Sequence, residues 1–304
     1  MKDMTSGVGT FALLALMLAA LGAAESESGW RFPLDKALFY RYQLSDEVSW
    51  RSSGDQLGYR SGMTWIFALK ATASDGATAT VQATIIRIQA SLDGPAAEVR
   101  VDSNDAGSTS DPVYGPLIAL AGSTLTLTVE QATGRVSAVS GGDEVIAQIN
   151  KRHPASVPSD PPPLAAAARQ LYSSEALAAW WTQVLAQPAK EIQPVPLAPP
   201  LSGNLQRTWS GDRYTLSLPE SVHALAITLV EGTNAVNGSL TAVAGSGQVR
   251  MDQGVLAKAA GELTYALFLT ALTQAVEQQH KQLWSLEPWA VVPDKEPAKS
   301  SPRK

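Results

Sequence analysis

One stretch of the chain alternates apolar and polar residues with a period of two, and this alternation constrains the fold more than any other feature. Between Gly122 and Gly141, the residues Leu125, Leu127 and Val129 alternate with threonines. Successive side chains of a strand point to opposite faces, so one face of this strand is apolar and faces a core. The run 130–134 that follows ends in Gly134, which can supply the positive φ of a tight turn. The stretch therefore predicts a β-hairpin.

A shorter copy of this pattern lies near the far end of the chain, between Gly245 and Gly261. Its turn reads Asp252-Gln253-Gly254 and corresponds to 130–134 of the first copy. In each copy a second glycine lies seven positions beyond the turn glycine, at Gly141 and Gly261. Two related hairpins predict a mainly β (α+β) protein built from two related antiparallel halves.

Other segments rich in β-branched and aromatic residues, and bounded by turn residues, are also predicted strands. They are 37–50, 63–71, 77–92, 97–103, 207–209, 214–218, 223–231 and 239–244. Asn237-Gly238 predicts a two-residue hairpin turn before the last of them.

The segment 261–286 supports two interpretations. It contains good helix formers and no proline, so propensity favours a helix. Leu263, Tyr265, Leu267 and Leu269 occupy alternate positions, although Phe268 interrupts the pattern. We favour two long strands with a turn near 270–274.

A few helices are expected beside the strands, at 114–121, 142–151 and 164–187. Prolines cluster on both sides of the last one, so 153–200 is predicted to be a connector. The predicted organisation is one β-rich domain, 30–291, with halves 36–152 and 201–290. A charged tail, 293–304, is expected to be disordered.

Composition excludes several kinds of protein. The chain of 304 residues has no cysteine, so it has neither disulfides nor thiolate metal sites. Its formal net charge of -5 argues against a nucleic-acid partner. Lys2 and the apolar run 11–21 precede small residues that end at Ala24, which predicts a signal peptide, 1–24. An uncleaved N-terminal anchor is the alternative. We expect an exported, periplasmic or extracellular protein with no transmembrane span in its mature chain.

No catalytic or metal-binding pattern is apparent. His153, His223 and His280 lack the spacing of metal ligands and are expected at the surface or at strand edges. The run 102–107 resembles a calcium loop but lacks the acidic residue that should close it, so a solvated turn is favoured. Phosphate-binding glycine loops and a serine nucleophile motif are absent from the sequence. We expect neither a cofactor nor an enzymatic activity.

The tryptophans are the remaining candidates for a binding site. Trp180 and Trp181 are adjacent on the expected helix, and Trp65 and Trp209 lie on expected strands. Core packing explains such residues most simply. If a concave sheet leaves part of its apolar face uncovered, they would line a groove for a lipid or a hydrophobic peptide. A structural or assembly protein of the cell envelope, which would contact another envelope protein and hold no small ligand, is the alternative.

Several segments together resemble an uncharacterised family of secreted bacterial proteins that carries only a domain-of-unknown-function label. They are 40–42, 85–88, 101–103, 117–122, 134–136 and 142–143, and the resemblance covers most of 37–286. It implies a two-half antiparallel sheet curved over helices, similar to the half-barrels of lipoprotein carriers. It implies no activity and no catalytic residues.

Overall fold

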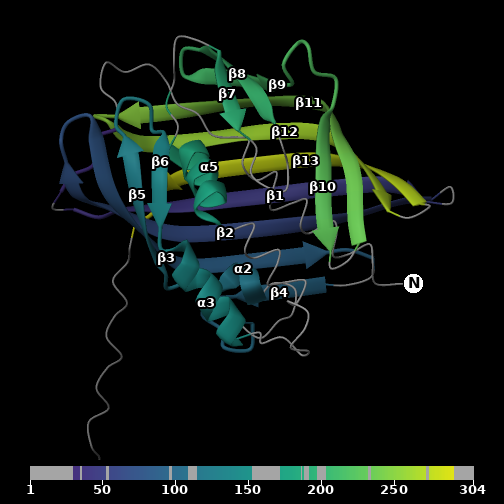
Figure 1. Ribbon diagram of the computed structural model, residues 1–304, viewed down its shortest axis with the longest axis horizontal. Coiled ribbons are helices and arrows are strands. Elements are labelled where there is room, and N and C mark those ends of the chain that lie inside the picture. Colours follow the sequence, from purple (N-terminus) through teal and green to yellow (C-terminus); the bar gives the residue numbers. More distant parts are fainter. Residues whose placement is uncertain are drawn as a thin grey trace, which may run out of the picture.

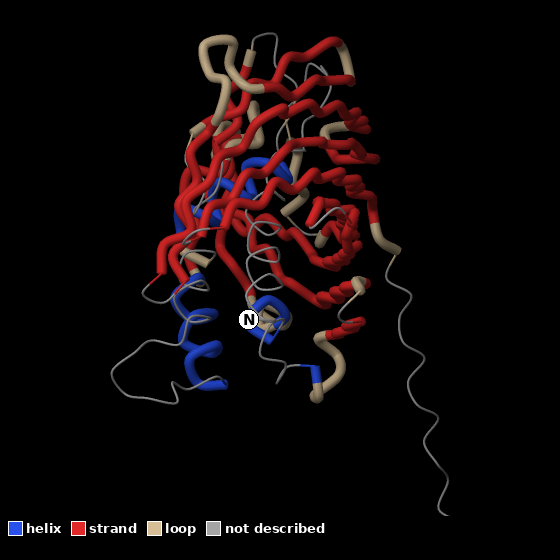
Figure 2. Tube along the Cα trace, turned by 90° about the vertical axis from the view of Figure 1, so that its right-hand side faces the viewer, coloured by secondary structure: helices blue, strands red, loops and turns tan. Residues whose placement is uncertain are grey.

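The structure is a computed structural model. It describes residues 30–34, 36–52, 55–95, 98–108, 115–152, 172–185, 187, 192–196, 203–231, 234–271 and 274–290. The predicted signal peptide, most of the connector and the charged tail lie outside these residues. The described chain forms a curved, antiparallel 13-stranded sheet with a few helices, which confirms the predicted fold class. Figures 1 and 2 show the curvature of its long strands.

Two groups of strands lie before and after the two longer helices, and one short helix interrupts the first group. The first group is β1 (Leu38–Ser52), β2 (Asp55–Ser74), β3 (Thr78–Asp93), β4 (Glu98–Asp102), β5 (Thr124–Glu130) and β6 (Val136–Ser140). The helices are α2 (Gly115–Ile118), α3 (Gly142–Arg152) and α5 (Ser174–Leu185). The last group is β7 (Gln193–Pro196), β8 (Asn204–Ser210), β9 (Arg213–Ser217), β10 (Leu225–Glu231), β11 (Asn234–Asp252), β12 (Val255–Ala271) and β13 (Gln274–Pro288).

The first and last long strands pair with each other at the centre of the sheet. The order is β6-β5-β3-β2-β1-β13-β12-β11-β9-β8-β7. In the β1–β13 pairing Tyr42 faces Leu286, and Leu44 faces Trp284. Strands from before and after the connector therefore form one continuous sheet.

Towards each end of the sheet, one long strand pairs with two shorter strands in turn. One half of β3 pairs with β5 and the other half with β4. On the opposite side β11 pairs with β10 and then with β9. The two hairpins of the sequence pattern, however, occupy different places, since β5–β6 ends the sheet and β11–β12 lies inside it.

The contested segment 261–286 is strand, as favoured from its parity. It covers most of β12 and β13, which pair along their length. Leu263, Tyr265, Leu267 and Leu269 are buried, whereas Phe268 is 43% exposed. Phe268 points to the outer face and does not interrupt the alternation. Burial of one face overrides the helix propensity of these residues.

The predicted turn at Asn237-Gly238 is wrong. Both residues lie within β11, where they pair with Thr228 and Ile227 of β10. A Cβ atom on Gly238 would lie 2.3 Å from the Phe268 carbonyl oxygen. This glycine thus permits the close approach of β12, and it does not supply the positive φ of a turn.

Helix α5 packs on the concave face of the sheet, in front of the central strands in Figure 1. Its buried residues include Leu177, Trp180, Trp181 and Val184, whose helical spacing places them on the side of the helix that faces the sheet. Among the described residues, no helix is long and apolar enough to cross a membrane.

Candidate functional site

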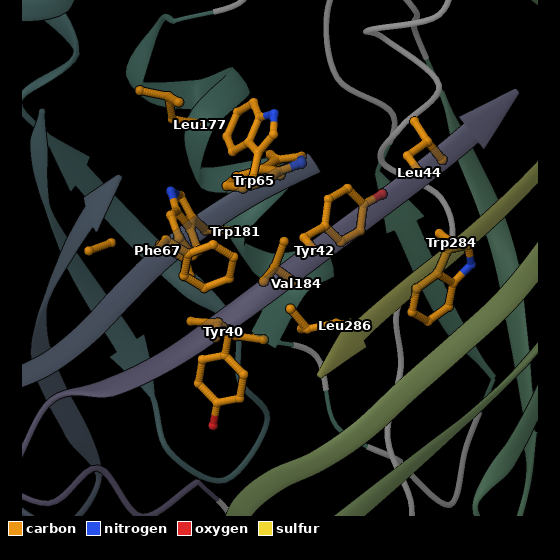
Figure 3. Close-up of a cluster of buried hydrophobic side chains, with 14 of the residues drawn as sticks. Tyr40, Tyr42, Leu44, Trp65, Phe67, Leu177, Trp181, Val184, Trp284 and Leu286 are labelled. Carbon is orange, nitrogen blue, oxygen red and sulfur yellow. The ribbon is translucent and has the colours of Figure 1, made fainter. Parts of the chain in front are cut away.

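Helix α5 brings predicted site residues together in an aromatic cluster, shown in Figure 3. The rings of Trp65 and Trp180 have centroids 4.6 Å apart, and Trp181 lies 5.2 Å from Phe67. Tyr42 meets Trp180 edge-on at 6.4 Å. Trp181 is fully buried, and Trp65 and Trp180 are 6% and 7% exposed. These side chains pack α5 against the sheet. Their contact with a ligand stays a prediction.

Local hydrogen bonds hold α5 in this position. The Ser173 hydroxyl accepts a hydrogen bond from the Ala176 N–H at 3.2 Å and so caps the first turn of the helix. Thr182 accepts a hydrogen bond from the backbone N–H of Val136 at 2.9 Å, which ties the helix to β6. The helix is therefore fixed between the sheet centre and its first edge.

Trp209 lies apart from the other candidates. Its ring packs against Tyr214 with the centroids 5.0 Å apart, and its indole N–H donates to Gln193 Oε1 at 3.2 Å. Trp209 contributes to a shallow hollow of about 610 Å³, and Leu283 lines both this hollow and a larger one of about 790 Å³. Trp65, Trp180 and Trp181 do not line these two hollows.

A buried group of polar side chains, here called the Asp46 cluster, lies on the concave face beyond the aromatic cluster. His280 Nδ1 is 3.0 Å from Asp46 Oδ2, and both side chains have no exposed surface. The other ring nitrogen of His280 is 3.3 Å from Gln278 Oε1. The His280 ring stacks on Tyr265 with centroids 4.4 Å apart. The cluster comprises Asp46, Ser61, Tyr265, Gln278, His280 and Gln282.

The strand register assembles this cluster. Asp46 is paired with Ser61 on one side and with Gln282 on the other. His280 is paired with Tyr265. The expected surface or edge position is wrong for His280, whereas His223 is exposed as expected and His153 lies outside the described residues. The available signal was parity, since His280 and Gln282 share the parity of the buried Trp284 and Leu286.

The cluster contains hydrogen-bonding capacity that the protein does not use. Asp46 Oδ1 and Ser61 Oγ are buried without a hydrogen-bond partner. Burial raises the pKa of Tyr265 far above its usual value, and the negative charge of Asp46 raises it further. Tyr265 is therefore a neutral hydrogen-bonding group, and its hydroxyl oxygen accepts a hydrogen bond from the Gln282 amide at 3.2 Å. Unpaired buried polar atoms cost about 1–3 kcal/mol each, and they mark a place where a bound polar group would be stabilised.

The loop that resembled a calcium site is a hydrogen-bonded turn. Asp105 accepts hydrogen bonds from Gly107 N–H at 3.1 Å and from the Ser108 hydroxyl at 3.0 Å. Asp102 pairs with Arg87, and this interaction lowers the pKa of Asp102 to about 2. Within the described part of the chain, no cluster of acidic or histidine side chains could hold a metal ion.

No family profile matches the chain, and no curated protein is significantly similar to it, so the family resemblance stays an expectation.

Solved structures give weak likenesses. A protein assigned as AttH from Nitrosomonas europaea aligns with 89% of this chain and 59% of its own, at 9% identity and a TM-score of 0.24. The chain thus spans less than two thirds of that protein. The translocator domain of the autotransporter NalP from Neisseria meningitidis is 6% identical, with 93% and 94% coverage and a TM-score of 0.22. OpdQ from Pseudomonas aeruginosa is also 6% identical, with 84% and 98% coverage and a TM-score of 0.19. Likenesses at these TM-scores support no statement about activity or ligand.

Proposed function

We propose that the protein is an exported, non-enzymatic binding or carrier module for an amphipathic ligand of the cell envelope, held on the concave face of the sheet. The observation that carries this proposal is that the buried face of β1 changes from aromatic to polar contacts along the strand. Tyr42 contacts the aromatic cluster, and Asp46, two inward positions further on, begins the Asp46 cluster. A ligand with an apolar part and a polar part matches this division.

The Asp46 cluster favours a bound ligand over packing by protein side chains alone. A core needs no buried carboxylate, because apolar side chains of similar volume fill the same space without the cost of removing a charge from water. Asp46 is 1% exposed and keeps one oxygen unpaired. A hydroxyl or amide donor on the ligand would satisfy the free oxygen.

Native mass spectrometry of the protein secreted from a bacterial host tests the proposal, followed by titration with dodecanol monitored by tryptophan fluorescence. We expect an added ligand mass and saturable binding of dodecanol. Trp65→Ala should weaken that binding, and Trp289→Ala is the matched control because Trp289 is half-buried and packs on Arg41. Bare protein mass together with no response to dodecanol would reject the proposal.

A structural role in the envelope is the second candidate. It is favoured by the burial of Trp180 and Trp181, which fill the interface between α5 and the sheet with protein side chains. The rejection outcome just described would support this role.

A further inference from the structure

The side chain of Arg207 is a buried positive charge that lies against helix α5. Arg207 of β8 is 2% exposed. Its guanidinium donates one hydrogen bond, from Nη2 to Oε1 of Gln183 at 3.0 Å, and its Nε atom is buried without a partner. Within the part of the chain that the structure describes, no carboxylate pairs with Arg207.

The surroundings of Arg207 are aromatic. Its guanidinium carbon lies 5.2 Å from the ring centroid of Tyr214 and 5.8 Å from that of Trp209. Gln183 follows Trp180 by three positions on α5, so it lies one helical turn from the ring that meets Tyr42. Cation–π contacts of this kind stabilise a guanidinium but do not neutralise it.

A second unpaired donor belongs to the same region. The Tyr42 hydroxyl is buried without a hydrogen-bond partner. Tyr42 lies close enough to Tyr214 to interact with it electrostatically. A negative charge on the Tyr42 oxygen would raise the pKa of Tyr214 further. Burial raises the pKa of Tyr42 as well, so its hydroxyl remains a donor at neutral pH. Two buried donors, on β1 and β8, therefore lack an acceptor.

The charge of Arg207 persists despite its burial. Burial lowers the pKa of Arg207 to about 10, which still leaves the guanidinium protonated at neutral pH. A charge that is buried without its counter-ion destabilises the folded protein, and a neutral side chain could bridge β8 to Gln183 at lower cost. An anion that arrives from outside the chain would remove this cost.

We propose that Arg207, assisted by the Tyr42 hydroxyl, binds the anionic head group of the ligand. The aromatic surroundings select an anion attached to an apolar chain over a free inorganic ion. A guanidinium offers paired donors to carboxylate and phosphate groups alike, so the shared chemistry is an anionic amphiphile. This inference rests on the proposed function and specifies its ligand class.

Calorimetric titration of the mature protein with laurate, dodecyl phosphate and dodecanol tests the inference. The unmodified protein should bind one of the two anions at least tenfold more tightly than dodecanol, and the preferred anion identifies the head group. Arg207→Gln should lose this preference while still binding dodecanol. The matched control is Arg213→Gln, an exposed arginine on the neighbouring strand, which should keep the preference.

Tyr42→Phe keeps the inference testable if Arg207→Gln fails to fold, because it removes a single oxygen. It should weaken binding of the preferred anion at least threefold more than it weakens binding of dodecanol. Equal affinity of the unmodified protein for dodecanol and both anions would overturn the role of Arg207 and leave the proposed function intact. Absence of binding by all three compounds would instead reject the proposed function.

Discussion

The side chains of Asp46 and His280 lie 3.0 Å apart with no exposed surface, although 234 positions separate them in the sequence. Removing one member of such a pair leaves the other buried without its partner. His280→Ala should therefore lower the free energy of unfolding by about 3 kcal/mol. Urea denaturation followed by circular dichroism measures the change.

Glu47→Ala is the matched control for this pair. Glu47 neighbours Asp46 in β1 but points outward and pairs with Arg60 at the surface. Exposed ion pairs contribute at most about 1 kcal/mol, so this variant should remain close to the unmodified protein. Similar losses of unfolding free energy in the two variants would show that the buried pair contributes no more to stability than the exposed pair.

Residues 30 and 31 connect two turns that are distant in the sequence. The N–H of Trp30 donates to the Gln131 carbonyl at 2.7 Å, and that of Arg31 donates to the Gly254 carbonyl at 2.8 Å. The Trp30 indole also donates to the Leu185 carbonyl at the end of α5. Trp30→Ala should destabilise the protein by about 3 kcal/mol and speed amide exchange in both turns. Hydrogen exchange by mass spectrometry checks this coupling, and unchanged exchange at either turn would contradict it.

Gly261 makes room for a neighbouring tryptophan. A Cβ atom at this position would lie 2.7 Å from the Trp284 indole nitrogen and 2.6 Å from the Ser246 carbonyl oxygen. Because the backbone oxygen cannot move easily, Gly261→Ala should cost about 2 kcal/mol. Ala260→Ser, on the adjacent position with its side chain on the outer face, should cost less than about 0.5 kcal/mol. Thermal unfolding compares the two variants.

Trp181 and Trp50 test how burial determines the contribution of an aromatic ring to the free energy of unfolding. Trp181 is fully buried between α5 and Phe67, whereas Trp50 is half-buried beside Tyr59. Trp181→Ala should cost about 4 kcal/mol and Trp50→Ala clearly less. Guanidinium denaturation gives both values, and equal losses would argue against the docking of α5.

The ion pair of Asp102 and Arg87 should make stability depend on acidic pH. The pKa of Asp102 falls from 3.8 to about 2 on folding, mainly through its hydrogen bond with Arg87. A lowered pKa stabilises the folded state above the unfolded-state value, and this contribution disappears as the pH falls towards 2. The pair is partly exposed, so the contribution is about 1 kcal/mol. Asp102→Asn should be less stable than the unmodified protein at pH 6 by this amount, and the difference should vanish near pH 2.

Local patterns predicted much of the fold. Alternation located β5 and the strands of 261–286, and β-branched and aromatic residues located β1 and β3. The error at Asn237-Gly238 has a physical cause, since a glycine serves equally for a turn and for the close approach of two backbones. Only the neighbouring Phe268 carbonyl distinguishes these two uses.

The candidate site was less accessible to sequence reasoning. Trp65, Trp180 and Trp181 meet as a group because they belong to apolar faces that pack together. Asp46, His280 and Arg207 were not among the predicted site residues, since polar residues in a strand are normally assigned to its exposed face, although His280 shares the parity of the buried Trp284.

The sequence by itself determined which segments are strands, because the period-2 pattern is a property of neighbouring residues. The tertiary structure alone decided that β1 and β13 pair at the centre of the sheet. Strand pairing depends on backbone hydrogen bonds between segments of any separation, and no local pattern records the partner. That long-range pairing buries Asp46 with His280, and the packing of α5 buries Arg207 beside Gln183.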